Sequence, residues 1–435
     1  MNRQQAHTRS SAPATPQTNG AARKARRPDL DWLRTLIVLA IIPYHALVLY
    51  TVASGTVILH PAAATWTAPL YRALEEWGIL FIFLLAGAAS VFALRSRSLG
   101  AYAWERALRL LVPLSVVALL FAPVRSYYLA LANPALLHVS PVPISHPERM
   151  RNIGIFFLEY WRILFTTGST IVSRNPIAHL WFVPRLIAVS LVSAPLIQAL
   201  RRRWPEWAER VGGHWIPATA LLVGGGLIPT VVTFLLEPGW LNRLTVGFPL
   251  ADNWSAFTLC LYWFITGALI YASSRLLQAA RELAYVTLTL ALAGGSVAFG
   301  IMLSGHAPAP DYSAGSLLYT TLRIFSIWLL TLGVLGLGAR FLNVSLAWQP
   351  GLVAAAFPVY LLHLPLLLAT AYYLQYLPLP WPTQMTLAII IALPGSFALY
   401  TYVVRRVPAI GLLFGVPNTR PARPSVIRNA RLSPP

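Results

Sequence analysis

A histidine lies deep in the first apolar segment of the chain. His45 belongs to the run RPDLDWLRTLIVLAIIPYHALVLY and follows Asp31 by 14 residues. In a helix, a rise of about 1.5 Å per residue places the imidazole about 21 Å further along the axis, past the middle of a bilayer. Desolvation there keeps the ring neutral, and a neutral imidazole can accept a proton as a general base. The alternative is a structural histidine that bonds to a neighbouring helix.

Two charged residues open the same segment. Asp31 and Arg34 are three residues apart, so they share one face of a helix and can form an ion pair. The simplest interpretation is a pair that anchors the helix at the membrane surface.

Four arginines lie close together in the stretch LRSRSLGAYAWERALRLLVPL. Arg95 and Arg97 fall in a predicted loop, and Arg106 and Arg109 share a helical face. Guanidinium groups bind phosphate through two parallel hydrogen bonds, so this group can hold a phosphorylated ligand. The competing interpretation is the ordinary excess of positive charge in cytoplasmic loops. Glu105 beside the arginines weakens an argument from charge alone.

Two further stretches place polar side chains at membrane depth. HLWFVPRL contains His179, Trp181 and Arg185, and FPVYLLHLPLL contains Tyr360 and His363 on one helical face. A tryptophan at a membrane interface is ordinary, but an ionisable group inside a span costs about 2.5–3.5 kcal/mol and usually marks a site or a pathway. These residues are therefore candidates for function.

Several chemistries find no support in the sequence. The histidines lie on different segments and lack the spacing of zinc ligands, so we expect no metal site. Cys260 is the single cysteine, which excludes an internal disulfide. Neither a glycine-rich phosphate loop nor a Gly-x-Ser-x-Gly elbow occurs, and we expect no tightly bound cofactor.

The composition is that of a membrane protein. The chain has 435 residues, of which 57% are hydrophobic and 11% are charged. The net charge of +20 does not indicate nucleic acid, because the arginines lie in the tails and in short loops between apolar segments. The lipid bilayer is the expected environment, and the fold class is an all-α bundle of membrane helices.

Ten apolar runs are long enough to span a bilayer, and the arginines orient them. Every second loop between the spans is rich in arginine, and arginine-rich loops tend to stay in the cytoplasm. Both termini lie on the same side as these loops and are therefore predicted to be cytoplasmic. The long outer loop 125–176 also contains arginines, but the charge rule holds only weakly for long loops. The predicted spans are 30–52, 74–94, 107–124, 177–200, 215–236, 253–272, 283–304, 315–338, 351–376 and 384–404.

Three regions flank or interrupt the predicted membrane domain of residues 29–405. Residues 1–28 and 406–435 are expected to be disordered basic tails, without a signal peptide. The outer loop 125–176 includes NIGIFFLEYWRILF, which is too short to span and predicts an interfacial helix. This loop is either a structural lid or a wall of an acceptor site.

Five motifs in this order resemble the acyltransferase family 3 integral membrane proteins, which include glucan O-succinylating and O-antigen O-acetylating enzymes. They are LDWLRTLIVLAIIPYH, FIFLLAGAAS, ERALRLLVPL, HLWFVPRL and FPVYLLH, and the resemblance covers roughly residues 30–405. It implies transfer of an acyl group, acetyl or succinyl, from cytoplasmic acyl-CoA to a hydroxyl of a cell-envelope carbohydrate on the outer face of the cytoplasmic membrane.

The resemblance also implies roles for residues. His45 matches the family's histidine in the first span and is expected to be the catalytic base. Arg106 and Arg109 match its Arg-x-x-Arg pair and are expected to face CoA. The usual Ser-Gly-Phe of the second span is Ala86-Gly87-Ala88 here, so a role for that serine does not transfer. The hydrolase-like domain of some members is not found, so we expect the membrane region to handle the acceptor.

Together these observations predict one site that crosses the membrane. Acyl-CoA is expected to dock at the inner arginines and to extend its pantetheine arm towards His45, while the acceptor approaches from the Trp181 side. The expected groups are catalytic His45, His363 and Tyr360; acyl-CoA-binding Arg34, Arg95, Arg97, Arg106 and Arg109; acceptor-side His179, Trp181 and Arg185; and Asp31, which orients Arg34. A covalent acyl-histidine intermediate and direct transfer both remain open.

Two other classes of function fit the same pattern. Ten spans with polar residues at mid-depth also suit a secondary transporter or flippase of a glycan or small acidic solute, although no inverted repeat is visible. A polytopic sensor or scaffold is the third class. The small-residue run GVLGLG at 333–338 allows close helix packing within one chain or in a homo-oligomer. The partner of Arg323 in the eighth span is left open.

Overall fold

A computed structural model describes residues 27–51, 66–137, 147–168, 177–212, 215–239 and 253–416. Their regular secondary structure is entirely helical, as predicted. The two predicted basic tails lie outside these residues, except for residues 27, 28 and 406–416. Parts of the predicted outer loop, at 138–146 and 169–176, also lie outside them.

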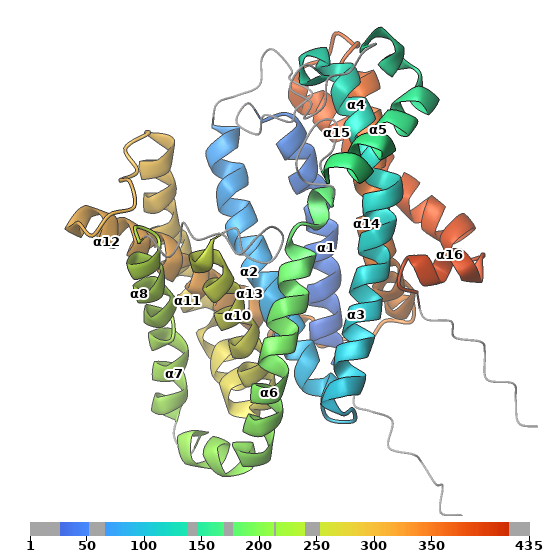
Figure 1. Ribbon diagram of the computed structural model, residues 1–435. Helices are drawn as coiled ribbons and strands as arrows, with labels where there is room; N and C mark the ends of the chain where they lie inside the picture. Colours follow the sequence, from blue (N-terminus) through green and yellow to red (C-terminus); the bar gives the residue numbers. More distant parts are fainter. Residues whose placement is uncertain are drawn as a thin grey trace, which may run out of the picture.

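Ten helical segments in the described part of the chain are long and apolar enough to cross a membrane. Consecutive segments alternate in direction, so the protein is an up-and-down helical bundle (Figure 1). The segments are α1 (Pro28–Leu49), α2 (Thr67–Ala93), α3 to α4 (Leu99–Ala132), α6 (Phe182–Gly212), α7 (Trp215–Gly224) with α8 (Leu227–Leu236), α10 (Trp254–Ala272), α11 (Ser274–Leu303), α12 to α13 (Ala314–Phe341), α14 (Gln349–Leu374) and α15 (Trp381–Leu399) with its extension to Val404.

The third span is longer than predicted. The sequence suggested residues 107–124, but the helix continues from α3 (Leu99–Val116) through a π-helical turn, Val117–Phe121, into α4 (Ala122–Ala132). The predicted start of the outer loop at residue 125 was therefore wrong. Pro123 lies just after this π-helical turn, and a local π adjustment is one way in which a continuous membrane helix accommodates a proline.

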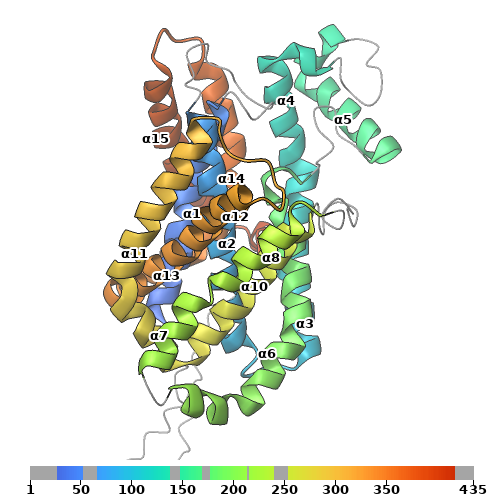
Figure 2. The ribbon, with the colours of Figure 1, turned by 90° about the vertical axis from the view of Figure 1, so that its left-hand side faces the viewer.

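The short helix predicted in the outer loop is present as α5 (Ile153–Thr167). The side chain of Asn152 accepts hydrogen bonds from the N–H groups of Gly154 and Ile155 and so begins the helix. Gly168, with φ of 68°, ends it. Both views place α4 and α5 at the end of the bundle opposite the turn between α6 and α7 (Figures 1 and 2).

One face of α5 packs on the bundle and the other is apolar and exposed. Phe156, Tyr160 and Ile163 are fully buried against α4. Leu158 and Phe165 are 74% and 75% exposed. An exposed apolar face on a helix too short to span suits a helix that lies in a membrane interface.

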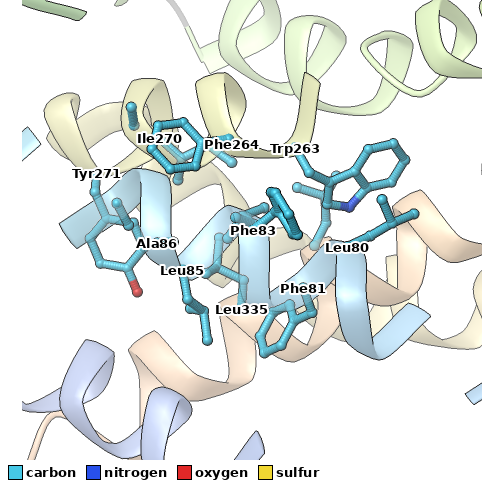
Figure 3. Packing of buried hydrophobic residues seen from close by; sticks show 14 of the residues in the cluster. Leu80, Phe81, Phe83, Leu85, Ala86, Trp263, Phe264, Ile270, Tyr271 and Leu335 are labelled. Carbon is cyan, nitrogen blue, oxygen red and sulfur yellow. The ribbon is translucent and has the colours of Figure 1, made fainter. Parts of the chain in front are cut away.

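The centre of the bundle is the crossing of α2 and α10, where the two backbones touch. A Cβ atom on Gly87 would lie 1.8 Å from the carbonyl oxygen of Phe264, and one on Gly267 would lie 2.0 Å from that of Leu84. Large side chains from α2, α10 and α13 fill the space on either side, including Phe83 (Figure 3). Without a strong hydrophobic force in lipid, such close approach is how membrane helices gain packing energy.

The run GVLGLG packs within the chain. A Cβ on Gly336 would lie 2.1 Å from the carbonyl oxygen of Ala280 in α11, and one on Gly338 would lie 2.7 Å from the side chain of Leu33 in α1. These glycines therefore join α13 to its intramolecular neighbours.

Arg323 has two carboxylate partners from distant parts of the sequence. Its guanidinium lies 3.0 Å from Glu76 of α2 and 2.6 Å from Glu237, which follows α8. Arg323 itself sits in the π-helical turn Thr321–Phe325 between α12 and α13. This ion-paired group ties three segments together and explains why an arginine is tolerated at that depth.

The α2–α10 crossing generates a stability prediction. Gly87→Ala and Gly267→Ala should each destabilise the protein by about 1–3 kcal/mol, because the added methyl group overlaps backbone atoms that cannot swing aside. The measurement is the melting temperature of the purified protein in detergent. Gly300→Ala in α11 is the matched control, since a Cβ there meets no atom within 4 Å. Equal melting temperatures for all three variants would contradict the crossing.

Candidate active site

Two histidines meet where α1 packs against α14. Nδ1 of His45 lies 2.7 Å from Nε2 of His363, and the two rings are stacked with centroids 5.0 Å apart. His363 is completely buried and His45 is half-buried. The two residues are 318 positions apart, so only the packing of the first and ninth spans brings them together.

The hydrogen bonds of His363 determine the tautomers of both rings. Nδ1 of His363 also bonds to the backbone carbonyl oxygen of Tyr360, and a carbonyl can only accept. In a neutral ring, His363 therefore donates from Nδ1 and accepts at Nε2, and the proton between the rings belongs to Nδ1 of His45. The lone pair of a neutral His45 is then on Nε2, the geometry of a general base oriented by a second group.

His179 and the side chain of Tyr360 complete an aromatic cluster around this pair. The His179 ring lies 5.7 Å from that of His45 and 5.4 Å from that of His363, measured between centroids. The Tyr360 hydroxyl donates a 3.0 Å hydrogen bond to the backbone carbonyl of His179. This bond joins α14 to the short 3-10 helix Ala178–Leu180 that precedes α6. It fixes the backbone that carries His179.

The His179 imidazole is itself buried and lacks hydrogen bonds. It is 8% exposed, and neither ring nitrogen has a hydrogen-bond partner among the described residues. Burial lowers the pKa of His179 well below its ordinary value, and the nearby His363 and Arg125 lower it further. At neutral pH the ring is therefore uncharged. Unpaired buried polar atoms of this kind are rare and suggest that a ligand satisfies them.

A cavity of about 390 Å³ opens beside the histidines. Its wall includes His45, His179 and Tyr360 at one end, and otherwise consists largely of apolar and aromatic side chains of α1 and α2. A second cavity of about 370 Å³ shares three lining residues with it and continues towards the opposite end of α1. The shared residues are Ile37, Ala40 and Trp77.

Arg34 lies on the same face of α1 as His45. The two residues are eleven positions apart, which is about three helical turns and about 17 Å along the axis. Arg34 is exposed and interacts electrostatically with Asp31, Arg106 and Arg109. The structure thus brings together four of the charged residues that the sequence nominated, at the end of α1 remote from the histidine.

The two arginines of α3 have different partners. Arg106 donates to the hydroxyls of Tyr102 and Ser90 and to the backbone carbonyl of Ala86, at 3.2, 2.8 and 3.3 Å. These bonds tie α3 to α2. Arg109 is more than half exposed and forms an ion pair with Glu105 at 2.9 Å. Arg109 therefore keeps more of its surface for a ligand than Arg106 does.

The remaining arginines of this group lie at the turn between α2 and α3. Arg97 also pairs with Glu105, at 2.9 Å, and the Arg95 guanidinium stands over the ring of Phe92. Glu105 thus compensates part of the positive charge. Arg97 and Arg109 thus share one carboxylate partner, and Arg95 lies in the same turn between α2 and α3 as Arg97.

The predicted acceptor-side residues lie next to the histidine cluster. Trp181 lines the cavity, and the Arg185 guanidinium stands 5.2 Å from the centre of its ring. Cation–π contact of this kind is one way in which a buried arginine is stabilised.

Two cavity residues and one buried acid were not singled out in the sequence. Tyr44 and Glu75 line the cavity, and the rule that ionisable groups inside spans mark sites could have found Glu75. Asp29, 1% exposed, accepts two hydrogen bonds from Arg27 and one from Tyr271, so it anchors the start of α1. The hydrogen bond to Asp29 raises the pKa of Arg27.

The described residues define a polytopic helical membrane protein with a buried, hydrogen-bonded histidine pair beside a cavity. Among them, no group of three or more His, Cys, Asp or Glu side chains is placed to hold a metal ion. The chain matches the acyltransferase family 3 model, described as an acyltransferase domain, over residues 27–401. It belongs to that family and is an acyltransferase. No match was found among curated proteins or among solved structures.

The histidine pair predicts a graded effect of substitution at His363. His363→Leu removes the acceptor for the Nδ1 proton of His45, so acyl transfer should fall by about 10²–10⁴-fold, the usual range for losing an aligned acid or base. His363→Gln restores an acceptor oxygen and should recover part of the rate. The measurement is kcat, with KM for the acyl donor unchanged. Equal rates in both variants would contradict a positioning role.

Proposed function

We propose that this protein transfers an acyl group, acetyl or succinyl, from cytoplasmic acyl-CoA to a hydroxyl of a cell-envelope carbohydrate or related acceptor. The observation that carries the proposal is the hydrogen-bond chain from the Tyr360 carbonyl through His363 to His45, which leaves the Nε2 lone pair of His45 for a substrate. Family membership supports the acyl-transfer class of the reaction.

The chemistry of direct transfer balances around His45. Nε2 of His45 removes the proton of the acceptor hydroxyl as its oxygen attacks the thioester carbonyl. The resulting imidazolium keeps its Nδ1–H bond to His363, which spreads the charge within a site that excludes water. When the carbon–sulfur bond breaks, the leaving thiolate takes the proton from Nε2, and the ester and free CoA are the products.

The charged end of α1 is proposed as the donor site. CoA carries a nucleotide with several phosphate groups, and Arg34 with the exposed Arg109 offers guanidiniums for them. Asp31 is proposed to orient Arg34. The roughly 17 Å between Arg34 and His45 must then be covered by the extended pantetheine arm. Arg106 contributes mainly by holding α3 against α2.

The acceptor is proposed to enter at the histidine end, beside Trp181 and His179. This arrangement separates a cytoplasmic donor from an acceptor on the outer face of the cytoplasmic membrane, with both termini in the cytoplasm. The apolar lining of the cavity keeps bulk water from the thioester, which limits hydrolysis.

The proposal predicts that label transfer depends on His45. Membranes that contain the protein should move label from acetyl- or succinyl-CoA to the envelope glycan, and His45→Ala should reduce the rate by at least about 10²-fold because the base is lost. The measurement is radiolabel in the glycan fraction. Movement of the glycan across the membrane without acylation would instead favour a transporter.

The donor site predicts a selective effect at Arg34. Arg34→Gln should raise KM for acyl-CoA by roughly 10–100-fold, the cost of losing hydrogen bonds to a charged group. Turnover of an acyl-pantetheine thioester, which lacks the nucleotide, should not change. Arg72→Gln, which removes an exposed arginine near the other end of the bundle, is the control. Equal losses with both thioesters would contradict a contact between Arg34 and the nucleotide.

A further inference from the structure

The second cavity beside α1 opens sideways at the middle depth of the membrane. Side chains of α1, α2 and α13 form its wall, and its volume is about 370 Å³. Leu36 and Phe341 in this wall are 45% and 55% exposed, and Ala40 is exposed as well. Ala40 lies about 18 Å along α1, which is about 33 Å long, so it is close to the centre of a bilayer. Because lipid surrounds a membrane protein at that depth, the open side of the cavity faces hydrocarbon.

The wall of this second cavity offers almost no partner for a polar ligand. Of the described residues that line it, Trp77 is the one whose side chain carries a polar atom. That indole is stacked on the ring of Phe81, with centroids 5.3 Å apart. Burying an amide or a hydroxyl without a hydrogen bond costs free energy, which disfavours both a sugar and the amide-containing pantetheine arm in this cavity. The cavity has the size of a small-ligand site, and a hydrocarbon chain suits its wall.

The two cavities lie on a different face of α1 from the proposed donor site. Arg34 lines neither of them. Ala40 follows Arg34 by six residues, which places it about 120° away around the helix. Leu36, Ala40 and Tyr44 follow one another at intervals of four residues, so the cavities run along one face of α1. A chain in the cavities and a donor bound at Arg34 therefore do not compete for the same face of the helix.

Together the two cavities form one groove along α1 (the α1 groove) that ends at the histidines. The first cavity has His45 and His179 in its wall and shares Ile37, Ala40 and Trp77 with the second. His45 is five residues beyond Ala40, about 7.5 Å along the helix axis. A molecule whose chain fills the groove thus places its head beside His45. In the proposed orientation the groove runs inward from the outer face, as the chains of an outer-leaflet lipid do.

We propose that the α1 groove binds the hydrocarbon chain of a lipid-anchored acceptor, whose hydroxylated head is deprotonated by His45. The inference rests on the proposed function and names its acceptor class: a carbohydrate or other hydroxylated group carried on a membrane lipid, in place of a free water-soluble glycan. The bonds formed and broken are those of the ester formation described above, and the chain takes no part in them. Contacts with the chain orient the head, as remote binding contacts do in other enzymes.

The test follows the acylated product between two phases. Membranes that contain the wild type are incubated with labelled acyl-CoA and extracted with chloroform and methanol, and membranes with His45→Ala supply the background. Label above this background is expected in the organic phase, because an acceptor that keeps its hydrocarbon chain is extracted with the lipids. The measurement needs no assumption about which sugar or other head group carries the hydroxyl.

Ala40→Phe tests the groove itself. The added ring stands where the two cavities join and should lower the organic-phase label by roughly 10-fold or more, because the chain and the ring cannot share the space. KM for acyl-CoA should not change. Ala293→Phe is the matched control, since Ala293 is also exposed within a span but lines neither cavity. Equal organic-phase label in the two variants would overturn the inference.

A second variant covers the case in which Ala40→Phe lowers the melting temperature in detergent. Leu36→Trp narrows the second cavity further from His45, at a side chain that is already exposed, and should reduce the same label. A rise in KM for acyl-CoA in either groove variant, with the acceptor reaction otherwise intact, would place the donor in the groove and overturn the inference.

Two outcomes separate this inference from the proposed function. Label above the His45→Ala background in the aqueous glycan fraction alone would overturn the inference and leave the proposed function standing. Absence of label above that background in both phases would overturn both.

Discussion

The hydrogen bond between His45 and His363 is the interaction on which the candidate site depends. Burial of an imidazole is costly unless its polar atoms are hydrogen-bonded, and the carbonyl of Tyr360 starts a chain that satisfies both nitrogens of the buried His363 and one of the half-buried His45. The fourth ring nitrogen, Nε2 of His45, is the atom that we propose accepts the proton of the acceptor hydroxyl. In that proposal, desolvation and hydrogen bonding together make the two histidines act as one directed base.

The rest of the bundle keeps that geometry in place. Glycines at the α2–α10 crossing bring the backbones into contact, and Arg323 joins three segments through two carboxylates. Arg106 ties α3 to α2. Packing and hydrogen bonding between helices are the main stabilising forces in a membrane, because lipid supplies no hydrophobic force between them. A rigid frame then holds the histidines at a fixed distance from the arginines.

The two ends of the bundle carry different chemical groups, which suits a reaction between two unlike substrates. Exposed guanidiniums gather at one end of α1, and the histidine cluster with its tryptophan-lined cavity lies towards the other. The guanidiniums match the phosphates of the proposed donor, and the aromatic cavity lies beside the proposed acceptor side. Family membership establishes acyl transfer, and this division of charge is a physical reason for proposing which substrate approaches from which side.

The sequence alone determined the ten spans, the α5 helix and the nomination of His45, because apolar length and the cost of burying ionisable groups are local properties. It misjudged the third span, where a π-helical turn carries the helix past residue 125. Only tertiary packing decided that His363 contacts His45, that Glu76 and Glu237 neutralise Arg323, and that Glu75 faces the cavity. Those contacts join residues far apart in the chain, and hydropathy and spacing carry no information about which faces of different helices meet.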